Sequence, residues 1–358
     1  MSEVNIDAGL FYKRLSIFQK QLTANNIPQA LIIVGARSDD NTYKKSTVLQ
    51  NWLLGYEFIH TAIYITDKKC IFITSEGKSK HLKHLTNQKP DLVELWIRTK
   101  DVEHNKQLFI KLLETMTKLD SKYGKILKDK YDGKFIDEWN QILNDNNNNT
   151  TNDHALSAVD LAVTVSQALA VKDSEEFNNT KIASNASVVM MDTFVNDMMI
   201  IVDDEKKITN SQLTDQIEDK IENNKWYLKT KLGKNLLQSI KDFDPEYLEY
   251  CYSPIIQSGG DYDLKPSAVS TDKPLIGEGV ILSSIGLRYK SYCSNIARTF
   301  LIDPTSEMET NYDFLLQLQK YIVDNLLKDG VPANKVYQDT IDYIKKERPD
   351  LVNHFTKN

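Results

Sequence analysis

Apolar residues in the first 120 positions alternate between helical and strand spacing. Leu15, Phe18 and Leu22 recur every three or four residues, which predicts an opening amphipathic helix. The helices expected after it share this spacing and cover residues 48–53, 82–85 and 108–116. The short apolar runs that predict strands are 30–34, 61–66, 70–74 and 92–97. Strands that alternate with helices in this way indicate an α/β lobe.

The pattern changes in the second half of the chain. Two long apolar-periodic segments, residues 173–200 and 209–224, predict helices, and Thr209 with Gln212 forms the capping box of the second. Strands are then expected at 252–257, 280–285 and 289–302, with Leu287-Arg288 as the loop between the last two, and helices return at 311–328 and 334–346. The fold expected is an α/β lobe over residues 1–170 followed by an α+β lobe over residues 171–358.

One segment between these regions has a different composition. Residues 144–153 consist almost entirely of Asn, Asp and Thr. Such a sequence buries no apolar surface, so it predicts a mobile surface loop.

Composition and charge narrow the classes of function. Of 358 residues 41% are hydrophobic, enough for large cores. Residues 1–165 hold 22 Lys and Arg against 20 Asp and Glu, whereas the remaining residues hold 22 against 30. An acidic second half favours a basic partner and argues against a strong direct nucleic-acid site. The longest strongly apolar stretches, such as 198–202, are too short to span a membrane. Three scattered cysteines form no disulfide or zinc pattern and fit a reducing compartment.

The segment from 280 to 299 reads V-I-L-S-S-I-G-L-R-Y-K-S-Y-C-S-N-I-A-R-T. It resembles the metal-binding hairpin of the creatinase/aminopeptidase family, the "pita-bread" metallopeptidases. That hairpin carries Asp-x-Gly and then Ser-Asp-x-Thr-Arg-Thr, and both Asp residues are metal ligands. Here Ser284 stands at the first Asp position, two before Gly286, and Asn295 stands at the second.

These two replacements remove the charge that a metal site needs. A metal pair that activates water is held by anionic oxygen ligands, whereas a serine hydroxyl and an asparagine amide are neutral. Ser267 also stands where the family has a substrate-contacting histidine. We therefore expect no catalytic residue, no metal and no cofactor. Ser267, Tyr292 and Arg298 are retained as candidate binding residues of the former substrate cleft.

A closer resemblance covers nearly the whole chain. The strings 43–47, 51–58, 252–259 and 292–304 are similar to the large-subunit family of the FACT histone chaperone complex. The resemblance implies a creatinase-like lobe and a peptidase-like lobe without a working metal site. It implies a non-catalytic module that binds core histones on chromatin in the nucleus and helps to reorganise nucleosomes in transcription, replication and repair.

The same resemblance implies features beyond this chain. The family's remaining metal ligands, a His and two Glu, come from strands expected after Phe355, so the second lobe is expected to be truncated. The smaller FACT subunit would bind through domains absent from this chain. Replication or transcription proteins are further expected partners.

Two other classes of function remain open. An active metalloaminopeptidase or proline-specific dipeptidase would be favoured by carboxylates at 284 and 295, and a structural spacer would bind nothing. A basic cluster on one predicted helix has two interpretations as well: a solvated surface, or a contact for an acidic or polar partner segment. Its members are Lys78, Lys80, His81 and Lys83.

Overall fold

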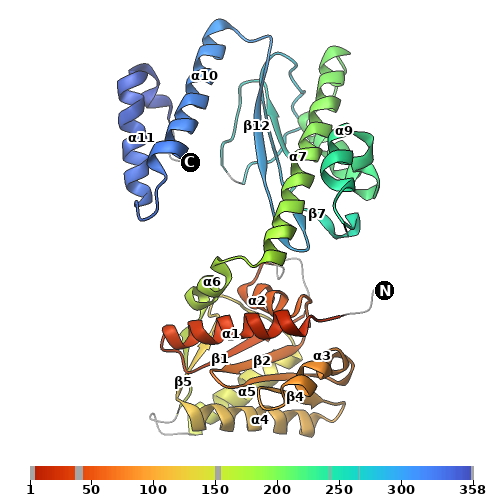
Figure 1. Ribbon diagram of the computed structural model, residues 1–358, viewed down its shortest axis with the longest axis vertical. Coiled ribbons are helices and arrows are strands. Elements are labelled where there is room, and N and C mark those ends of the chain that lie inside the picture. The colour runs from red at the N-terminus through yellow and green to blue at the C-terminus, as the bar shows by residue number, and fades with distance from the viewer. Residues whose placement is uncertain (1–4, 37–42, 150–154, 242, 266, 356–358) are drawn as a thin grey trace. The chain divides into compact units, whose positions relative to one another are not determined.

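The computed structural model of the chain describes residues 5–36, 43–149, 155–241, 243–265 and 267–355. The chain divides into two compact units, Met1–Lys172 and Asp173–Asn358 (Figure 1). Each unit has its own hydrophobic core. We call them the N-terminal and the C-terminal unit.

The N-terminal unit is built on one sheet with the strand order β4-β3-β2-β1-β5-β6. Only β2 runs against its neighbours; the pairs β3–β4, β1–β5 and β5–β6 are parallel. Its strands are β1 (Gln29–Val34), β2 (Thr61–Thr66), β3 (Cys70–Ser75), β4 (Val93–Arg98), β5 (Lys122–Lys125) and β6 (Ser157–Asp160). Its helices are α1 (Ala8–Ala24), α2 (Lys45–Leu54), α3 (Glu76–Gln88), α4 (Val102–Leu119), α5 (Lys134–Asn149) and α6 (Ala162–Ala170).

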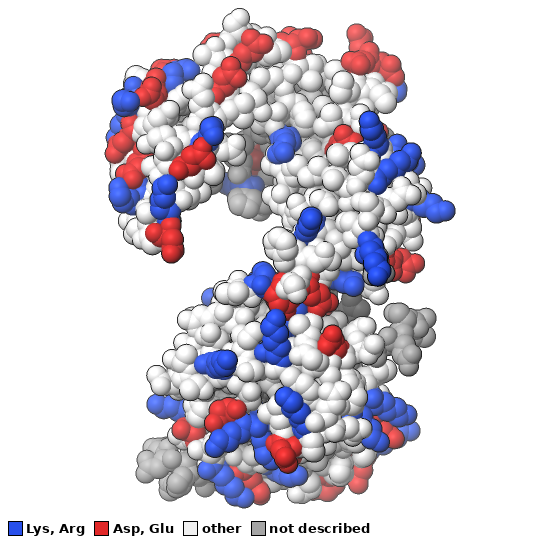
Figure 2. Space-filling model, in the orientation of Figure 1, with Lys and Arg blue, Asp and Glu red and all other residues white. Residues whose placement is uncertain are grey.

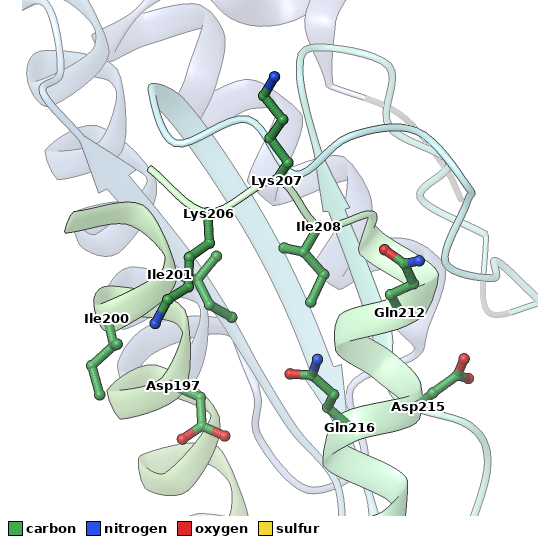
Figure 3. A pocket seen from close by; sticks show the side chains of 9 residues that line it. All are labelled: Asp197, Ile200, Ile201, Lys206, Lys207, Ile208, Gln212, Asp215 and Gln216. Carbon is green, nitrogen blue, oxygen red and sulfur yellow. The ribbon is translucent and has the colours of Figure 1, made fainter. Parts of the chain in front are cut away.

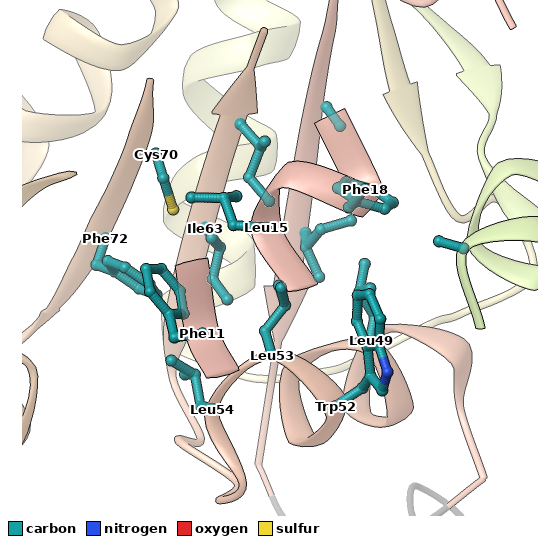
Figure 4. Close-up of a cluster of buried hydrophobic side chains, with 14 of the residues drawn as sticks. Phe11, Leu15, Phe18, Leu49, Trp52, Leu53, Leu54, Ile63, Cys70 and Phe72 are labelled. Carbon is teal, nitrogen blue, oxygen red and sulfur yellow. The ribbon is translucent and has the colours of Figure 1, made fainter. Parts of the chain in front are cut away.

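Two apolar cores cover the two faces of this sheet. On one face Phe11, Phe18 and Trp52 of α1 and α2 pack against Ile63 and Phe72 of the strands (Figure 4). On the other face, α4 and α5 supply the apolar cluster (Figure 1). Among the residues that these two helices contribute are Phe109, Phe135, Trp139 and Met116. The α/β architecture predicted for this lobe, with the 61–66 and 70–74 hairpin, is confirmed.

The Asn-rich segment is not the loop that its composition predicts, at least as far as residue 149. Helix α5 continues through it to Asn149. The side chain of Asn147 donates to the carbonyl of Leu156 at 3.1 Å and accepts from its amide at 3.1 Å. These bonds tie the last helical turns to a buried leucine, and they offset the low helix propensity of asparagine. Residues 150–153 lie outside the described residues.

The C-terminal unit combines one long helix with two small sheets, ordered β11-β10-β7 and β12-β9-β8. Its longer helices are α7 (Ser174–Asp203), α8 (Asn210–Glu218), α10 (Ser306–Tyr321) and α11 (Ala333–Glu347). Its strands are β7 (Leu248–Tyr250), β8 (Ile255–Ser258), β9 (Gly279–Ile285), β10 (Leu287–Tyr289), β11 (Tyr292–Cys293) and β12 (Ile296–Ile302). Short helical turns cover Asp219–Glu222, Trp226–Lys229, Lys231–Gly233, Lys234–Gln238, Pro245–Tyr247, Ile322–Leu326 and Pro349–His354.

Helix α7 forms the centre of this unit. It begins with a capping box in which Asp173 and Glu176 satisfy each other's backbone amides. Met190 and Phe194 on its inner face are fully buried in the core. By length and composition it is the one described helix that could span a membrane, although 44% of that window is buried inside the unit. The predicted Thr209–Gln212 capping box is confirmed at the start of α8.

The hairpin of this unit turns later than predicted. Leu287 and Arg288 form no loop, because they belong to β10, which pairs with both β7 and β11. The turn falls on Lys290 and Ser291, whose φ angles of 47° and 71° are left-handed. Leu287 and Tyr289 are buried on α7, and this burial keeps residues 287–289 extended. The prediction failed because it placed the turn at a basic residue and overlooked the buried apolar positions on either side.

Helices α10 and α11 pack against each other through Phe314, Leu318 and Ile344. Several apolar residues around α10 are nevertheless about half exposed, among them Leu315, Leu316, Val323 and Leu327. The truncation of the lobe inferred from the sequence stays a prediction.

Candidate functional site

Ser284 and Asn295, which the resemblance places at the positions of the family's aspartates, are brought together in the C-terminal unit. Ser284 lies on β9, and Asn295 immediately precedes β12, the antiparallel partner of β9. The hydroxyl of Ser284 donates to the amide oxygen of Asn295 at 3.2 Å. The two positions that the resemblance pairs are therefore in direct contact.

A third residue, Tyr252, completes this cluster. Its hydroxyl oxygen lies 2.8 Å from the Ser284 hydroxyl oxygen. It also donates to the Asn295 amide oxygen. We call Tyr252, Ser284 and Asn295 the polar triad. Burial raises the pKa of Tyr252, so its hydroxyl is neutral at pH 7.

Gly286 allows Tyr252 to reach the other two residues. A Cβ atom at Gly286 would lie 2.8 Å from the Tyr252 ring and 2.9 Å from the carbonyl oxygen of Ser294. The glycine joins β9 to β10 and leaves the space that the ring occupies. The glycine of the family's Asp-x-Gly pattern thus has a packing role here that does not depend on a metal.

The polar triad does not fit a metal ion. Its oxygen atoms come from two hydroxyls and one amide, and they are hydrogen-bonded to one another. A hard divalent cation needs anionic oxygens to replace its hydration shell. Within the described ranges, no group of three or more His, Cys, Asp or Glu side chains is placed to hold a metal ion. We therefore derive no metal-dependent step at this site.

The other candidates from the cleft lie apart from these hydrogen bonds. Ser267 is exposed on the segment after β8, and Ser270 instead bonds to the Ile256 amide at 2.8 Å. Tyr292 is half-buried on β11 opposite Tyr289. Arg298 is exposed on β12, and its guanidinium donates to the carbonyl of Ala297 at 2.7 Å. The hydrogen bonds among Tyr252, Ser284 and Asn295 involve none of these three residues, and the binding roles of Ser267, Tyr292 and Arg298 stay predictions.

The basic cluster lies on α3 of the N-terminal unit. Lys80 and Lys83 are exposed, whereas Lys78 is half-buried and donates to the carbonyl of Ile59. The ring of His81 lies 6.4 Å from that of Phe58. His84, on the same helix, contacts the carbonyl of Ile6 at 2.9 Å. Only Lys80 and Lys83 remain as an open basic surface of α3.

A separate cavity of about 840 Å³ lies between α7 and α8 (Figure 3). Asp197 and Ile201 line it from α7, and Gln212 and Gln216 from α8. Asp197 is paired with Lys220 at 2.6 Å, so its charge is balanced. The cavity shares no lining residue with the polar triad. Its lining residues include no Ser, Thr, Cys or His; they are Asp197, Ile200, Ile201, Lys206, Lys207, Ile208, Gln212, Asp215 and Gln216.

Charged residues on the face shown in Figure 2 are interspersed rather than segregated over α10 and α11. Ion pairs such as Lys335–Asp339 and Lys345–Asp342 account for this mixture. An extended basic stripe of the kind that grips nucleic acid is absent from this pair of described helices.

Two residues of the site, Tyr252 and Gly286, have roles that the sequence pattern did not predict. Tyr252 begins the strand expected at 252–257, and its contact with a residue 43 positions away has no local signal. The role of Gly286 could have been found, because a glycine inside a strand pattern marks a close backbone approach.

Comparison with known proteins matches each unit to a protein family. Residues 6–157 match the FACT complex subunit SPT16 N-terminal lobe domain, and residues 178–357 match metallopeptidase family M24. FACT complex subunit SPT16 of Candida albicans is 99% identical over 362 residues, covering 100% of this chain and 34% of that protein. The chain thus spans about a third of the length of the curated relatives it matches.

Solved structures agree with this assignment. The N-terminal domain of FACT complex subunit SPT16 from Eremothecium gossypii superposes with a TM-score of 0.89 at 39% identity, over 99% of this chain and 82% of that one. An X-Pro aminopeptidase from Thermotoga maritima gives a TM-score of 0.60 at 16% identity, over 92% and 78%, and shares the fold alone. The chain therefore belongs to the family of FACT complex subunit SPT16 N-terminal domains, with an M24 metallopeptidase fold in its C-terminal unit.

Proposed function

We propose that this chain is a non-catalytic protein-binding module of a histone chaperone. The observation that carries the proposal is the polar triad, in which neutral Ser284 and Asn295 contact Tyr252 and each other. The resemblance places these two residues at the positions of two metal-binding carboxylates. An M24 fold that keeps this hairpin but has no carboxylates on it can still bind a partner, although it cannot hold the metal ions that hydrolysis needs.

The contacts of Ser284 also argue against a metal-independent hydrolase. A serine nucleophile needs a base within hydrogen-bond reach. Ser284 contacts a tyrosine hydroxyl, whose pKa is raised by burial, and an amide oxygen. Neither group accepts a proton at pH 7. An active aminopeptidase or dipeptidase is therefore not favoured.

Core histones are the partners that we propose for this module. The relatives are named as FACT complex subunits, and residues 166–358 carry 30 acidic against 22 basic side chains. An acidic surface speeds encounter with strongly basic proteins. We infer a location on chromatin in the nucleus, and roles in nucleosome reorganisation during transcription, replication and repair. Replication or transcription proteins, and the smaller FACT subunit through domains outside this chain, are further proposed partners.

A fluorescence titration tests this proposal. The chain is titrated with core histones and with histone-tail peptides at physiological ionic strength, and with lysozyme as a basic protein of unrelated fold. The proposal expects saturable histone binding that is at least about tenfold tighter than lysozyme binding, a gap of roughly 1.4 kcal/mol. Equal affinity for histones and lysozyme would show that the chain binds basic proteins through net charge alone. An absence of saturable histone binding would favour the interpretation that the chain is a structural spacer.

A further inference from the structure

A second cavity lies in the N-terminal unit, at the edge where the parallel strands end. It has a volume of about 430 Å³, and His60, Arg98, Lys100, Lys134 and Glu138 line it. Arg98 ends β4, His60 precedes antiparallel β2, and Lys134 begins α5. The carboxyl edge of an α/β sheet is where ligands commonly bind, because side chains from several strand ends converge there.

Arg98 is the fixed element of this cavity. Its side chain is only 17% exposed and pairs with Glu138 at 3.0 Å. Its guanidinium carbon lies 4.5 Å from the centroid of the Phe135 ring. Among the described residues, the Nε atom of Arg98 is buried without a hydrogen-bond partner. A buried donor without an acceptor costs free energy, and an arginine fixed in place is well suited to recognising an oxyanion.

The cations around Arg98 oppose one another. His60 has a left-handed φ of 51°, and its pKa is lowered by burial, then by Lys78 and Arg98. Lys78 lies just beyond the lining and donates to the carbonyl of Ile59, next to His60. Burial and then Arg98 lower the pKa of Lys78 as well. Arg98 thus disfavours the cationic forms of both His60 and Lys78, and a bound anion would offset that repulsion.

The charge of the lining indicates which anion fits. Arg98, Lys100 and Lys134 contribute three positive charges and Glu138 one negative charge, which leaves two positive charges with His60 neutral. We propose that this cavity, named here the β4-edge pocket, binds a phosphate group, either as inorganic phosphate or on a phosphorylated side chain. A phosphate monoester carries a charge of about −1.5 to −2 at pH 7, which matches the excess, whereas a single carboxylate would leave one cation unbalanced.

The shape of the pocket favours a single phosphate over nucleic acid. The cations converge on one concavity of about 430 Å³, large enough for a phosphate and its flanking atoms. A nucleic-acid surface instead spreads its cations along successive phosphates. We therefore expect no binding of duplex DNA at this pocket.

Isothermal titration of the whole 358-residue chain tests the proposal. Inorganic phosphate is added at constant ionic strength, and a phosphoserine peptide is compared with its unphosphorylated form. The pocket variant is Lys100→Gln with Lys134→Gln, two exposed lysines whose loss leaves the core intact. The matched control is Lys118→Gln with Lys122→Gln, which removes the same charge from the end of α4 and the start of β5.

We expect the pocket variant to bind phosphate at least about tenfold more weakly, because charge-assisted hydrogen bonds are lost. The control should bind as the parent does. Phosphate should also raise the pKa of His60, measured by NMR of its imidazole protons. Tighter binding of the phosphopeptide than of inorganic phosphate would identify a phosphorylated side chain as the ligand, and the reverse order would identify free phosphate.

Three results would overturn the proposal. The first is no saturable binding of either phosphate source. The second is equal weakening in the pocket and control variants, because the effect would then come from net charge. The third is that the parent chain binds duplex DNA but neither phosphate nor the phosphopeptide, and that the pocket variant no longer binds the DNA.

Discussion

The hydroxyl oxygens of Tyr252 and Ser284 lie 2.8 Å apart, and both groups turn toward the amide oxygen of Asn295. In an M24 metallopeptidase fold, two of these three positions are expected to hold metal-binding carboxylates. Here a set of neutral hydrogen bonds takes the place of charge. Such a set contributes to stability, whereas two unpaired carboxylates at the same place would repel each other.

Tyr252→Phe should lower the stability of the C-terminal unit while preserving its fold. The substitution removes the hydroxyl that contacts Ser284 and Asn295 but keeps the ring packed on Gly286. We expect a loss of about 1–2 kcal/mol in the free energy of unfolding, measured by urea denaturation. Tyr247→Phe is the control, since that ring is 44% exposed. Equal effects of the two substitutions would show that the polar triad adds nothing.

Gly286→Ala should be more damaging than its size suggests. The new methyl group would meet the Tyr252 ring at 2.8 Å and the Ser294 carbonyl oxygen at 2.9 Å. Overpacking of this kind costs about 1–3 kcal/mol, again read from urea denaturation. Gly77→Ala is the matched control, because nothing lies within 4 Å of its added Cβ in helix α3. The control should be neutral or slightly stabilising, and a neutral Gly286→Ala would contradict the packing role.

Cys293 should react as a thiolate at neutral pH. The hydrogen bond from Cys251, with a smaller contribution from Arg288, lowers the pKa of Cys293 to about 6 against the opposing effect of burial. The iodoacetamide rate at exposed Cys293 should therefore rise through about pH 6 and level off above it. Mass spectrometry gives the site, and buried Cys70, whose pKa is raised by burial, serves as the unreactive internal reference.

Arg288→Gln should shift this reactivity profile to higher pH, because the substitution removes a cation that stabilises the thiolate. A midpoint near that of an ordinary thiol, about 8.5, in the unsubstituted chain would contradict the contact between Cys251 and Cys293.

Charge reversal on α3 tests the basic-cluster hypothesis. Lys80→Glu with Lys83→Glu alters the two lysines of the cluster that are exposed. Stability should change by less than about 0.5 kcal/mol, because neither side chain is buried. Histone binding in the fluorescence titration should change if this surface contacts the partner. The control is Lys118→Glu with Lys122→Glu, which makes the same change of charge elsewhere. Equal histone binding by the two double variants would show that Lys80 and Lys83 are ordinary solvated side chains.

Local sequence signals explain what could be predicted. Leu15, Phe18 and Leu22 define α1 because helix period and burial coincide, and Thr209 with Gln212 fixes the start of α8. Ser284 and Asn295 lie side by side because β9 and β12 are antiparallel neighbours. In each case the relevant interaction is local or set by strand pairing.

Contacts between distant segments explain what could not be predicted. Asn147 is helical because its side chain finds Leu156, and residues 287–289 are extended because α7 buries them. Tyr252 joins the polar triad across 43 positions of sequence. The β4-edge pocket assembles His60, Arg98 and Lys134 from three separate segments. No local pattern marks such convergence, since only the tertiary fold creates it.

The metal content of the purified chain tests the central claim most directly. The chain is incubated with zinc, manganese and cobalt ions, freed of unbound metal by gel filtration, and analysed for its elements. Because Ser284 and Asn295 supply no negative charge, the account predicts far less than one metal ion per chain. About one or two tightly bound ions per chain, with turnover of dipeptides that Ser284→Ala abolishes, would contradict it and restore the peptidase interpretation.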